Sequence, residues 1–564
     1  MESPAAPART SSQPLAEPRR GRAIAWLARH WFWLLFAGGI AANLVPLVLA
    51  PILPMSDVNG LEGMVGVLMH RHDPAVHTER YFDVHMHVSP NAFSFAFVFA
   101  LAHLMPITAA ANVFLALFAV IGLPCALLYT LRACGGDPRL SLFGVAATYH
   151  RCVWFGFLGS VAGVTFLVLQ VGLMTAAFSR ARASWRDVAL AVTLLLLAAS
   201  HAFLYAVGAA LFASWAVLAT GQPSRVSRRW APVLPSLAYL GPWLRHTFMA
   251  EGGSGGGLGR FAKHLWQMRP GSGVYLANLH EWFLDAYAGP SDEIVAAVFV
   301  AVLAVLLVRG IRPTDDREPV VTAPSSTPLS PDAPPTAYER SWARAWASRL
   351  PLTAAGLIVG YFLLPMSIRQ PFDWWAVNVR LIVPALMTLV LLVPRRARGL
   401  PGAVMAPVGV AALGYALVIA ADFHGWWMPV EIAGLRASLA HIPPGHSVHF
   451  VGPRVVDERH YRHFPMGHIV DQYLVERGGN ATPVMSSLPG DMWAAWKPVA
   501  GAPWGDNTVF SWARHATGWD YFLVKQPAPG NGARFQPFPD APPGVVAPTF
   551  AQGLWSVWRK QPAP

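Results

Sequence analysis

Blocks of apolar residues long enough to cross a lipid bilayer recur along this chain and constrain its fold more than any other feature. A transmembrane helix needs about 20 predominantly apolar residues to span roughly 30 Å of hydrocarbon. The composition agrees, since 54% of the 564 residues are hydrophobic and only 13% are charged, whereas soluble domains carry about 25% charged residues. We therefore predict a polytopic α-helical membrane protein with about ten or eleven transmembrane helices. Examples of these blocks are 31–53, 109–131, 161–178, 294–308, 354–366, 381–393 and 404–421.

The positive charge of the chain is concentrated in short connections between the apolar blocks. The net charge is +12, and membrane proteins keep an excess of Lys and Arg in their cytoplasmic loops. This distribution indicates orientation in a membrane and argues against nucleic-acid binding. We place the chain in a bacterial cytoplasmic (inner) membrane as a multi-pass protein, with its C-terminal region outside. The basic clusters lie at 19–29, 180–186, 225–229, 309–312 and 395–398.

Two segments decide how many times the chain crosses. Residues 188–220 are too long for one span, so we predict two short helices that meet near His201 at the outer surface. Residues 141–178 are placed as a single crossing, with 141–155 re-entrant or interfacial. This topology leaves Arg132 and Arg139 outside, against the charge rule.

Composition divides the chain into terminal, membrane and polar regions. Residues 1–30 and the cytoplasmic linker 313–337 are predicted to be disordered, because such composition cannot bury enough apolar surface to fold. Residues 31–422 form the predicted transmembrane domain. Residues 423–564 are predicted to form a small α/β domain outside the membrane. Its expected elements are helices at 430–441 and 466–476 and strands at 447–451, 520–525 and 554–559.

The first of two outer loops, 54–90 and 251–290, carries the main candidates for chemistry. Asp57 comes a few residues after the first transmembrane helix, and Glu62 begins a short apolar stretch. A carboxylate fixed at the outer surface can act as general base towards an acceptor hydroxyl. The alternative is that Asp57 is a loop acid that caps the start of a helix. The loop alone leaves both interpretations open.

The same loop contains a dense group of histidines with acidic residues between them. His85 and His87 would lie on one side of an extended strand, and Asp83 would lie on that side too. Imidazole and carboxylate together suit a divalent transition metal, so these residues are the candidate metal ligands. Their spacing matches no specific zinc motif, and the alternative is that they solvate phospholipid headgroups.

Two arginines near the outer ends of later helices are candidates for binding an anion. An arginine in lipid is costly and usually has an anionic partner, and guanidinium pairs well with phosphate oxygens. Arg380, which follows Asn378, lies deeper in the predicted membrane and is the stronger candidate for a lipid phosphate or pyrophosphate. Arg369 has the alternative interpretation of an interfacial residue whose charge reaches water.

Several short segments resemble the GT-C superfamily of membrane glycosyltransferases, which includes protein mannosyltransferases and aminoarabinose transferases. The resemblance covers nearly the whole chain. It implies a GT-C-like membrane domain that transfers a sugar from a polyprenyl-phosphate-linked donor to an acceptor on the outer face, by inverting displacement at the anomeric carbon. The segments that carry it are Asp57 after the first helix, 154–159 (WFGFLG), Ser200-His201, 378–386 (NVRLIVPAL), 439–445, 520–524 and 553–559.

The resemblance also implies roles for individual residues. Asp57 is the candidate general base, and Glu62 either assists it or binds a metal. The chain departs from the family pattern in having Val58-Asn59 after Asp57, where members often place a second acidic residue. The implied substrate-binding residues are Arg380 and Arg369 for the lipid phosphate, together with His201 and Asn378.

Two other classes of function stay open on the sequence alone. A lipid or solute transporter, or a flippase, would carry charged residues at helix centres and a repeat between its halves, and the sequence shows neither clearly. A non-catalytic scaffold that presents 423–564 to a partner would have no use for Asp57. A site that gathers Asp57, Glu62, His201 and Arg380 would favour the enzyme.

Overall fold

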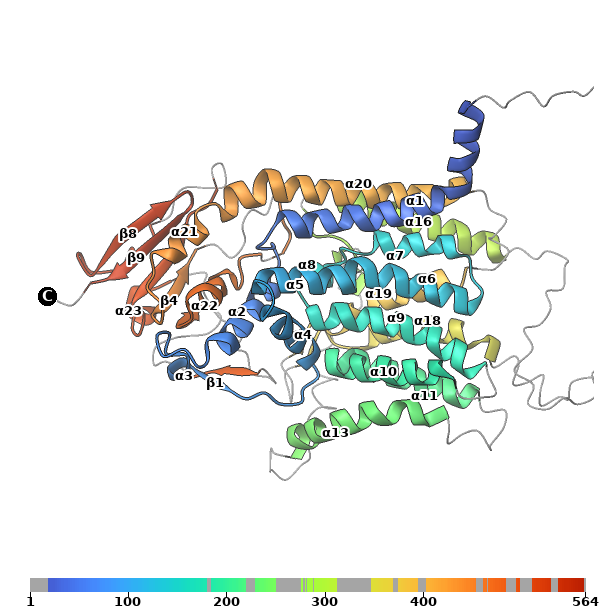
Figure 1. The fold of residues 1–564 in the computed structure, drawn as a ribbon, viewed down its shortest axis with the longest axis horizontal. Helices are drawn as coiled ribbons and strands as arrows, with labels where there is room; N and C mark the ends of the chain where they lie inside the picture. Colours follow the sequence, from blue (N-terminus) through green and yellow to red (C-terminus); the bar gives the residue numbers. More distant parts are fainter. Residues whose placement is uncertain are drawn as a thin grey trace, which may run out of the picture.

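The computed structural model shows a bundle of helices with a small domain at one end (Figure 1). We call that end of the bundle the domain end and the opposite end the basic end. The residues that the structure describes are 19–179, 184–219, 229–249, 275–276, 279, 281–287, 289–311, 346–368, 374–393, 402–452, 460–463, 465–482, 493–497, 510–528 and 536–561.

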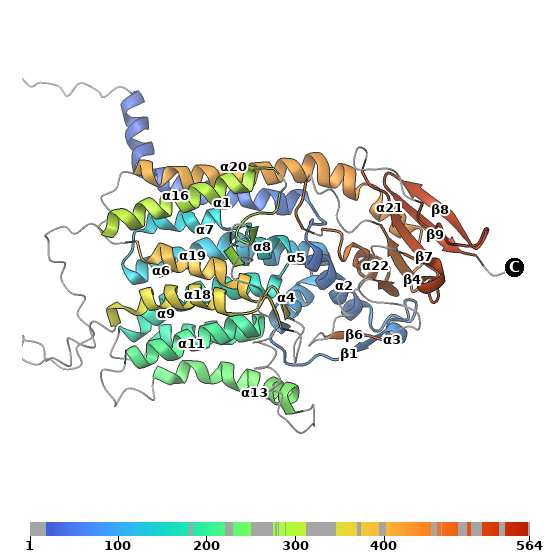
Figure 2. The ribbon, with the colours of Figure 1, turned by 180° about the vertical axis from the view of Figure 1, so that it is seen from behind.

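Long apolar helices form the bundle, as the sequence predicts. Within the described residues, 5 helical runs are long and apolar enough to cross a membrane: Ile24–Leu49, Ile107–Cys134, Leu158–Phe178, Ser291–Arg309 and Ala406–Ala440. Shorter helices run beside them, among them α11, α13 and α18, which can be followed in Figures 1 and 2. The elements are α1 (Arg19–Leu49), α4 (Ala92–Ala102), α5 (Ile107–Leu115), η1 (Ala116–Gly122), α6 (Leu123–Cys134), α9 (Leu158–Phe178), α10 (Trp185–Ser200), α11 (Ala202–Leu218), α13 (Leu234–Met249), α16 (Ser291–Ile311), α18 (Arg349–Leu363), α19 (Ile382–Leu391) and α20 (Ala406–Asp422).

The predicted break near His201 is confirmed. His201 has an extended backbone between α10 and α11. At the other end of α10, Ser184 and Asp187 form a capping box that satisfies backbone donors at the helix start.

Residues 138–157 travel through the bundle towards the domain end, which corrects the predicted re-entrant placement of 141–155. They contact first α1 and then the loop that follows it. The amide of Asn43 donates to the carbonyl of Val145 at 3.5 Å, and the hydroxyl of Tyr149 donates to the carbonyl of Asn43 at 2.7 Å. Beyond the end of α1, the backbone N–H of Asp57 donates to the carbonyl of Phe155 at 3.0 Å. The short elements of this connection are η2 (Pro138–Ser141), α7 (Leu142–Ala146) and α8 (Arg151–Trp154).

The same route places Arg132 and Arg139 at the basic end, whereas the predicted topology separated them from the other basic clusters. The guanidinium of Arg132 lies 5.8 Å from the ring centroid of Trp33, in the first half of α1. Arg139 pairs with Asp137 at 2.6 Å in the turn after α6. The charge rule and the helix contacts therefore agree.

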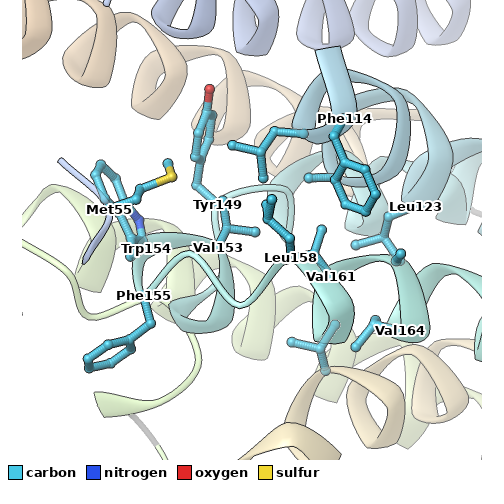
Figure 3. Packing of buried hydrophobic residues seen from close by; sticks show 14 of the residues in the cluster. Met55, Phe114, Leu123, Tyr149, Val153, Trp154, Phe155, Leu158, Val161 and Val164 are labelled. Atoms are coloured by element: carbon cyan, nitrogen blue, oxygen red, sulfur yellow. The ribbon is translucent and has the colours of Figure 1, made fainter. Parts of the chain in front are cut away.

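Buried apolar side chains hold the connection 149–158 against the start of the first loop. Figure 3 shows Trp154 beside Met55, with Tyr149 and Phe155 pointing to opposite sides of the connection. Trp154 and Met55 are both fully buried. Burial of side chains this large contributes roughly 1.5–3 kcal/mol each, so the backbone around Asp57 is firmly placed.

The C-terminal domain is an α/β unit that continues directly from the bundle. α20 runs into η8 (Phe423–Ile432), so the predicted boundary at 423 falls inside a continuous helical run. The main sheet has the strand order β5-β4-β7-β9-β8, in which β4 is parallel to β5 and β7 while β9 is antiparallel to β7 and β8. Its elements are α21 (Leu435–Ala440), β4 (Ser447–Val451), η9 (Ile469–Asp471), α22 (Gln472–Arg477), β5 (Asn480–Thr482), α23 (Trp512–His515), β7 (Tyr521–Lys525), β8 (Val546–Gln552) and β9 (Trp555–Lys560).

Most of the predicted elements of this domain are confirmed. The strands expected at 447–451, 520–525 and 554–559 are β4, β7 and β9, and α21, η9 and α22 lie within the expected helical segments. β5 and β8 were not predicted. At the N-terminus, residues 19–30 belong to α1, so the disorder predicted for them was wrong. Residues 1–18 and the linker 313–337 lie outside the described part of the chain.

The first loop docks on the C-terminal domain through a helix and a strand. α2 (Ser56–His70) packs against η9 and α22, and glycines allow the close approach. A Cβ at Gly63 would lie 2.5 Å from the Cβ of Asp471, and one at Gly66 would lie 2.7 Å from the carbonyl oxygen of Leu474. Further along the loop, β1 (Phe82–Val84) pairs with β6 (Ala494–Trp496) in an antiparallel ribbon. Loop and domain therefore form one unit at the domain end.

Candidate functional site

Asp57 lies in the first turn of α2, where the helix dipole favours a negative charge. The connection after α8 packs against the backbone of Asp57 and Val58. Gly156 has a φ of +80°, and a Cβ there would lie 2.5 Å from the backbone nitrogen of Val58. The Asp57 side chain remains 24% exposed, so its carboxyl group is both held and accessible.

The surroundings of Asp57 bring the pKa of its carboxyl group close to neutral pH. Burial raises the pKa of Asp57 from 3.8 to about 7, while the nearby Arg380 and a hydrogen bond from Ser56 act in the opposite direction. A carboxyl group with a pKa near the working pH is well suited to act as a general base.

Arg380 provides the positive charge of the site. It lies in η5 (Asn378–Leu381), just before α19, with its guanidinium 4.8 Å from the ring centroid of Phe157. The residue is only 8% exposed, and its Nε atom is buried with no hydrogen-bond partner among the described residues. A buried guanidinium with an unsatisfied donor favours an anionic ligand, because an unpaired charge in a low-dielectric interior is costly.

His201 and Asn378 take up supporting positions beside Arg380. The ring of His201 accepts a hydrogen bond from the backbone N–H of Leu204 at 3.5 Å. Burial, and secondly the charge of Arg380, hold the pKa of His201 well below its usual value, so its imidazole is neutral. Asn378 is fully buried and donates to the carbonyl of Tyr361 at 3.2 Å. It thereby anchors η5 to α18.

Aromatic rings form a wall next to these charges. Phe155 stacks on Phe157 and on Trp282, with ring centroids 5.4 Å and 5.3 Å apart. Trp375 meets Phe155 edge-on at 5.1 Å and is 43% exposed. The apolar wall lowers the local dielectric, which strengthens the interactions of the neighbouring charges.

Glu62 lies elsewhere. It is five residues further along α2 than Asp57, which turns it to a different face of the helix. The residue is 1% exposed and accepts a hydrogen bond from the amide of Gln472 at 2.5 Å. Burial raises the pKa of Glu62 to about 8. The structure thus places Glu62 in the contact between α2 and α22, and its catalytic role stays a prediction.

The predicted metal ligands are not assembled into a site. Across the described ranges, no group of His, Cys, Asp or Glu side chains could hold a metal ion. Asp83 pairs with Lys497 at 3.0 Å. The ring of His87 contacts the carbonyl of His85 at 2.8 Å within the loop. The segment instead pairs with β6 through its backbone, and the side chain of Asp83 is used by the ion pair with Lys497. Whether the protein requires a metal stays a prediction.

Arg369 lies outside the described residues. The structure therefore brings together Asp57, Arg380, His201 and Asn378 among the predicted site residues.

The C-terminal domain adds two residues that the sequence analysis missed. Nε2 of His468 lies 4.0 Å from Oδ1 of Asp57, and Nδ1 of the same ring lies 3.9 Å from Oδ2 of Asp471. Their spacing was a usable signal, because residues three apart at the start of a predicted helix share a face. The approach of that face to Asp57 required the tertiary structure.

Comparison with known proteins identifies the fold. The crystal structure of ArnT from Cupriavidus metallidurans bound to undecaprenyl phosphate matches with a TM-score of 0.50 and 12% identity, over 94% of this chain and 97% of that chain. The apo structure of ArnT gives a TM-score of 0.49 and 11% identity, over 95% and 98% of the respective chains. No protein-family model and no curated protein matches the sequence. The predicted polytopic helical membrane fold with a small C-terminal α/β domain is confirmed, and it is similar to the fold of ArnT.

Proposed function

We propose that the protein is a membrane glycosyltransferase that moves a sugar from a polyprenyl-phosphate-linked donor to an acceptor at the domain end. The electrostatic coupling of Asp57 and Arg380 carries this proposal, since a carboxyl group with a pKa of about 7 lies within the field of a buried guanidinium. The fold shared with ArnT supports a lipid phosphate as the anion, because that structure was solved with undecaprenyl phosphate bound.

The residues divide the work of an inverting displacement. Asp57 accepts the proton of the acceptor hydroxyl while that oxygen attacks the anomeric carbon. The bond between the anomeric carbon and the phosphate oxygen breaks, and Arg380 stabilises the departing lipid phosphate with charge-assisted hydrogen bonds. Asn378 and the neutral His201 complete the polar surface next to Arg380.

Helix-end charges support an outward orientation of this site. The ends of α6, α10, α16 and α18 that point away from the C-terminal domain can be followed in Figure 1. The terminal turns at these ends contain Arg132, Arg186, Arg309 and Arg349. Positive ends face the cytoplasm in membrane proteins. We therefore place the domain end, with the site and residues 423–564, on the outer face of a bacterial cytoplasmic membrane.

The first experiment measures the lipid. Mass spectrometry of lipids that co-purify with the full-length protein should detect a polyprenyl phosphate. Binding of added undecaprenyl phosphate should weaken by about 10- to 100-fold in Arg380→Gln, because loss of a buried charge-assisted contact costs about 2 kcal/mol or more. Arg559→Gln, at an exposed arginine of the C-terminal domain, is the matched control. Equal binding by Arg380→Gln and Arg559→Gln would remove Arg380 as the phosphate ligand.

The second experiment measures chemistry. The Asp57→Asn variant should still bind undecaprenyl phosphate. It should no longer transfer the sugar from an undecaprenyl-phosphate sugar, so no undecaprenyl phosphate should be released. Full turnover by Asp57→Asn would exclude Asp57 as the base.

A further inference from the structure

We infer that His468 is a proton-relay residue of this site: it takes over the proton that Asp57 accepts, and Asp471 positions its ring for that transfer. The inference rests on the proposed function and adds to it, because it makes the C-terminal domain a working part of the site.

The geometry aligns the three side chains in order. Oδ1 of Asp57 faces Nε2 of His468 at 4.0 Å, and Nδ1 faces Oδ2 of Asp471 at 3.9 Å. These separations suit one bridging water or a small closure when substrate binds, since catalytic hydrogen bonds are often long in unliganded sites. The His468 side chain is 13% exposed, and that of Asp471 is 1% exposed. The ring therefore lies between an accessible carboxyl group and a buried one.

The fold holds His468 at this place through the contact between α2 and the domain. The close approach at Gly63 sets the backbone of Asp471 against α2. One residue later, Gln472 donates to Asn59 at 2.9 Å and to Glu62 at 2.5 Å. His468 and Asp57 thus belong to two segments that are bonded to each other, and their separation is determined by the docked interface.

His468 and the neighbouring His463 place their rings differently. His468 occupies the position before η9, and its ring lies between the carboxyl groups of Asp57 and Asp471. His463 shows the contrast, because its Nε2 lies 2.6 Å from the carbonyl of Pro54 and its ring is buried against Trp154. Among the described residues, the charged groups near His468 include Asp57 from α2 and Asp471 from η9, and Arg380 from η5 acts on Asp57.

The proton balance of the relay is closed. The acceptor O–H bond breaks as oxygen bonds to the anomeric carbon, and the proton passes to the Asp57 carboxylate. It then passes to Nε2 of His468, which becomes an imidazolium that the Asp471 carboxylate stabilises. Release of that proton to solvent returns both residues to their starting states. This order resembles the general arrangement in which an acid orients a histidine.

The test uses full-length protein and two readouts. Infrared difference spectra assign the Asp57 carboxyl band by its absence in Asp57→Asn, and its titration needs no sugar donor. In His468→Gln the titration midpoint of Asp57 should fall by about one pH unit or less, because the protonated carboxyl group loses the neutral Nε2 acceptor that stabilises it. His446→Gln, at a half-exposed histidine of the same domain, should leave the midpoint unchanged.

Turnover of an undecaprenyl-phosphate sugar supplies the second readout. His468→Gln should slow turnover by about 10- to 100-fold without weakening undecaprenyl phosphate binding, and added imidazole should restore part of the rate to His468→Ala. The double variant His468→Gln/Asp471→Asn should be no slower than His468→Gln, because Asp471 acts through His468.

The outcomes separate this inference from the proposed function. If no undecaprenyl-phosphate sugar is turned over but the Asp57 midpoint falls in His468→Gln, the proposed reaction fails and the coupling of His468 to Asp57 stands. If sugar is turned over and His468→Gln matches His446→Gln in both midpoint and rate, the relay is overturned.

Discussion

The side-chain amide of Gln472 donates a 2.5 Å hydrogen bond to the carboxyl group of Glu62 and joins α22 of the C-terminal domain to α2. α2 also carries Asp57, and the segment before α22 carries His468. The contact that docks the domain therefore also sets the geometry of the candidate site, and perturbing it should affect both stability and function.

Replacement of Glu62 by Gln should remove a pH dependence of stability. Burial raises the pKa of Glu62 from 4.5 to about 8. Between these values the folded protein holds a proton that the unfolded chain has lost, so stability falls as pH rises from about 4.5 to 8. Gln stays neutral and keeps the hydrogen bond, so this contribution disappears. Melting temperatures of wild type and Glu62→Gln across this range test it, with Glu79→Gln, at an exposed acid of the same loop, as control. Identical pH slopes for all proteins would contradict the assignment.

The reaction itself should lose efficiency in acid. Below about pH 7 Asp57 becomes protonated in the unliganded protein, and a protonated carboxyl group cannot accept the acceptor proton. We expect kcat/KM to fall about tenfold per pH unit below this value, since kcat/KM reports the free enzyme. Asp73→Asn, at an exposed acid of the same loop, should retain the profile. A flat profile between pH 5 and 8 would argue against Asp57 as the base.

An alanine at Gly66 should loosen the domain. The added Cβ would lie 2.7 Å from the backbone carbonyl oxygen of Leu474, and backbone cannot move aside as a side chain can. Overpacking of this kind costs about 1–3 kcal/mol, so we expect a lower melting temperature and faster hydrogen exchange in α22. Gly414→Ala is the matched control, because no heavy atom lies within 4 Å of its added Cβ. Equal effects of the two substitutions would show that α2 and α22 are not tightly docked.

The buried ion pair between Lys525 and Glu431 should be essential for attaching the sheet to the bundle. Their charged atoms are 2.5 Å apart, and both side chains are 0% exposed. Burial lowers the pKa of Lys525 while Glu431 opposes this effect. Lys525→Met leaves a buried acid without its cation and should destabilise the protein by about 3–5 kcal/mol.

The double variant Lys525→Met/Glu431→Gln should recover much of the stability lost in Lys525→Met, since it removes both charges. Lys560→Met, at an exposed lysine of β9, is the control. Chemical unfolding measures all of these variants. A single variant as stable as this control would mean that the pair contributes little.

Local patterns account for what the sequence predicted correctly. The length of the apolar blocks predicted the long helices, and an over-long block predicted the turn at His201. Short apolar segments in the polar C-terminal region predicted β4, β7 and β9. The passage 138–157 escaped because its helices are too short to carry a transmembrane signal. Likewise His85 and His87 of the first loop indicated a metal site, while in the structure their backbone hydrogen-bonds with Trp493, just before β6.

The sequence by itself determined that this chain is a membrane protein, where its charged connections lie, and that Asp57 and Arg380 are chemically unusual for their positions. These properties depend on composition and short spacing, which the order of residues contains directly. Only the tertiary structure decided that Asp57, Arg380 and His468 meet while Glu62 turns away into the contact with Gln472. These contacts depend on how helices that are distant in the sequence pack together. The glycines of α2 and the left-handed Gly156 control that packing, and no sequence pattern marks them in advance.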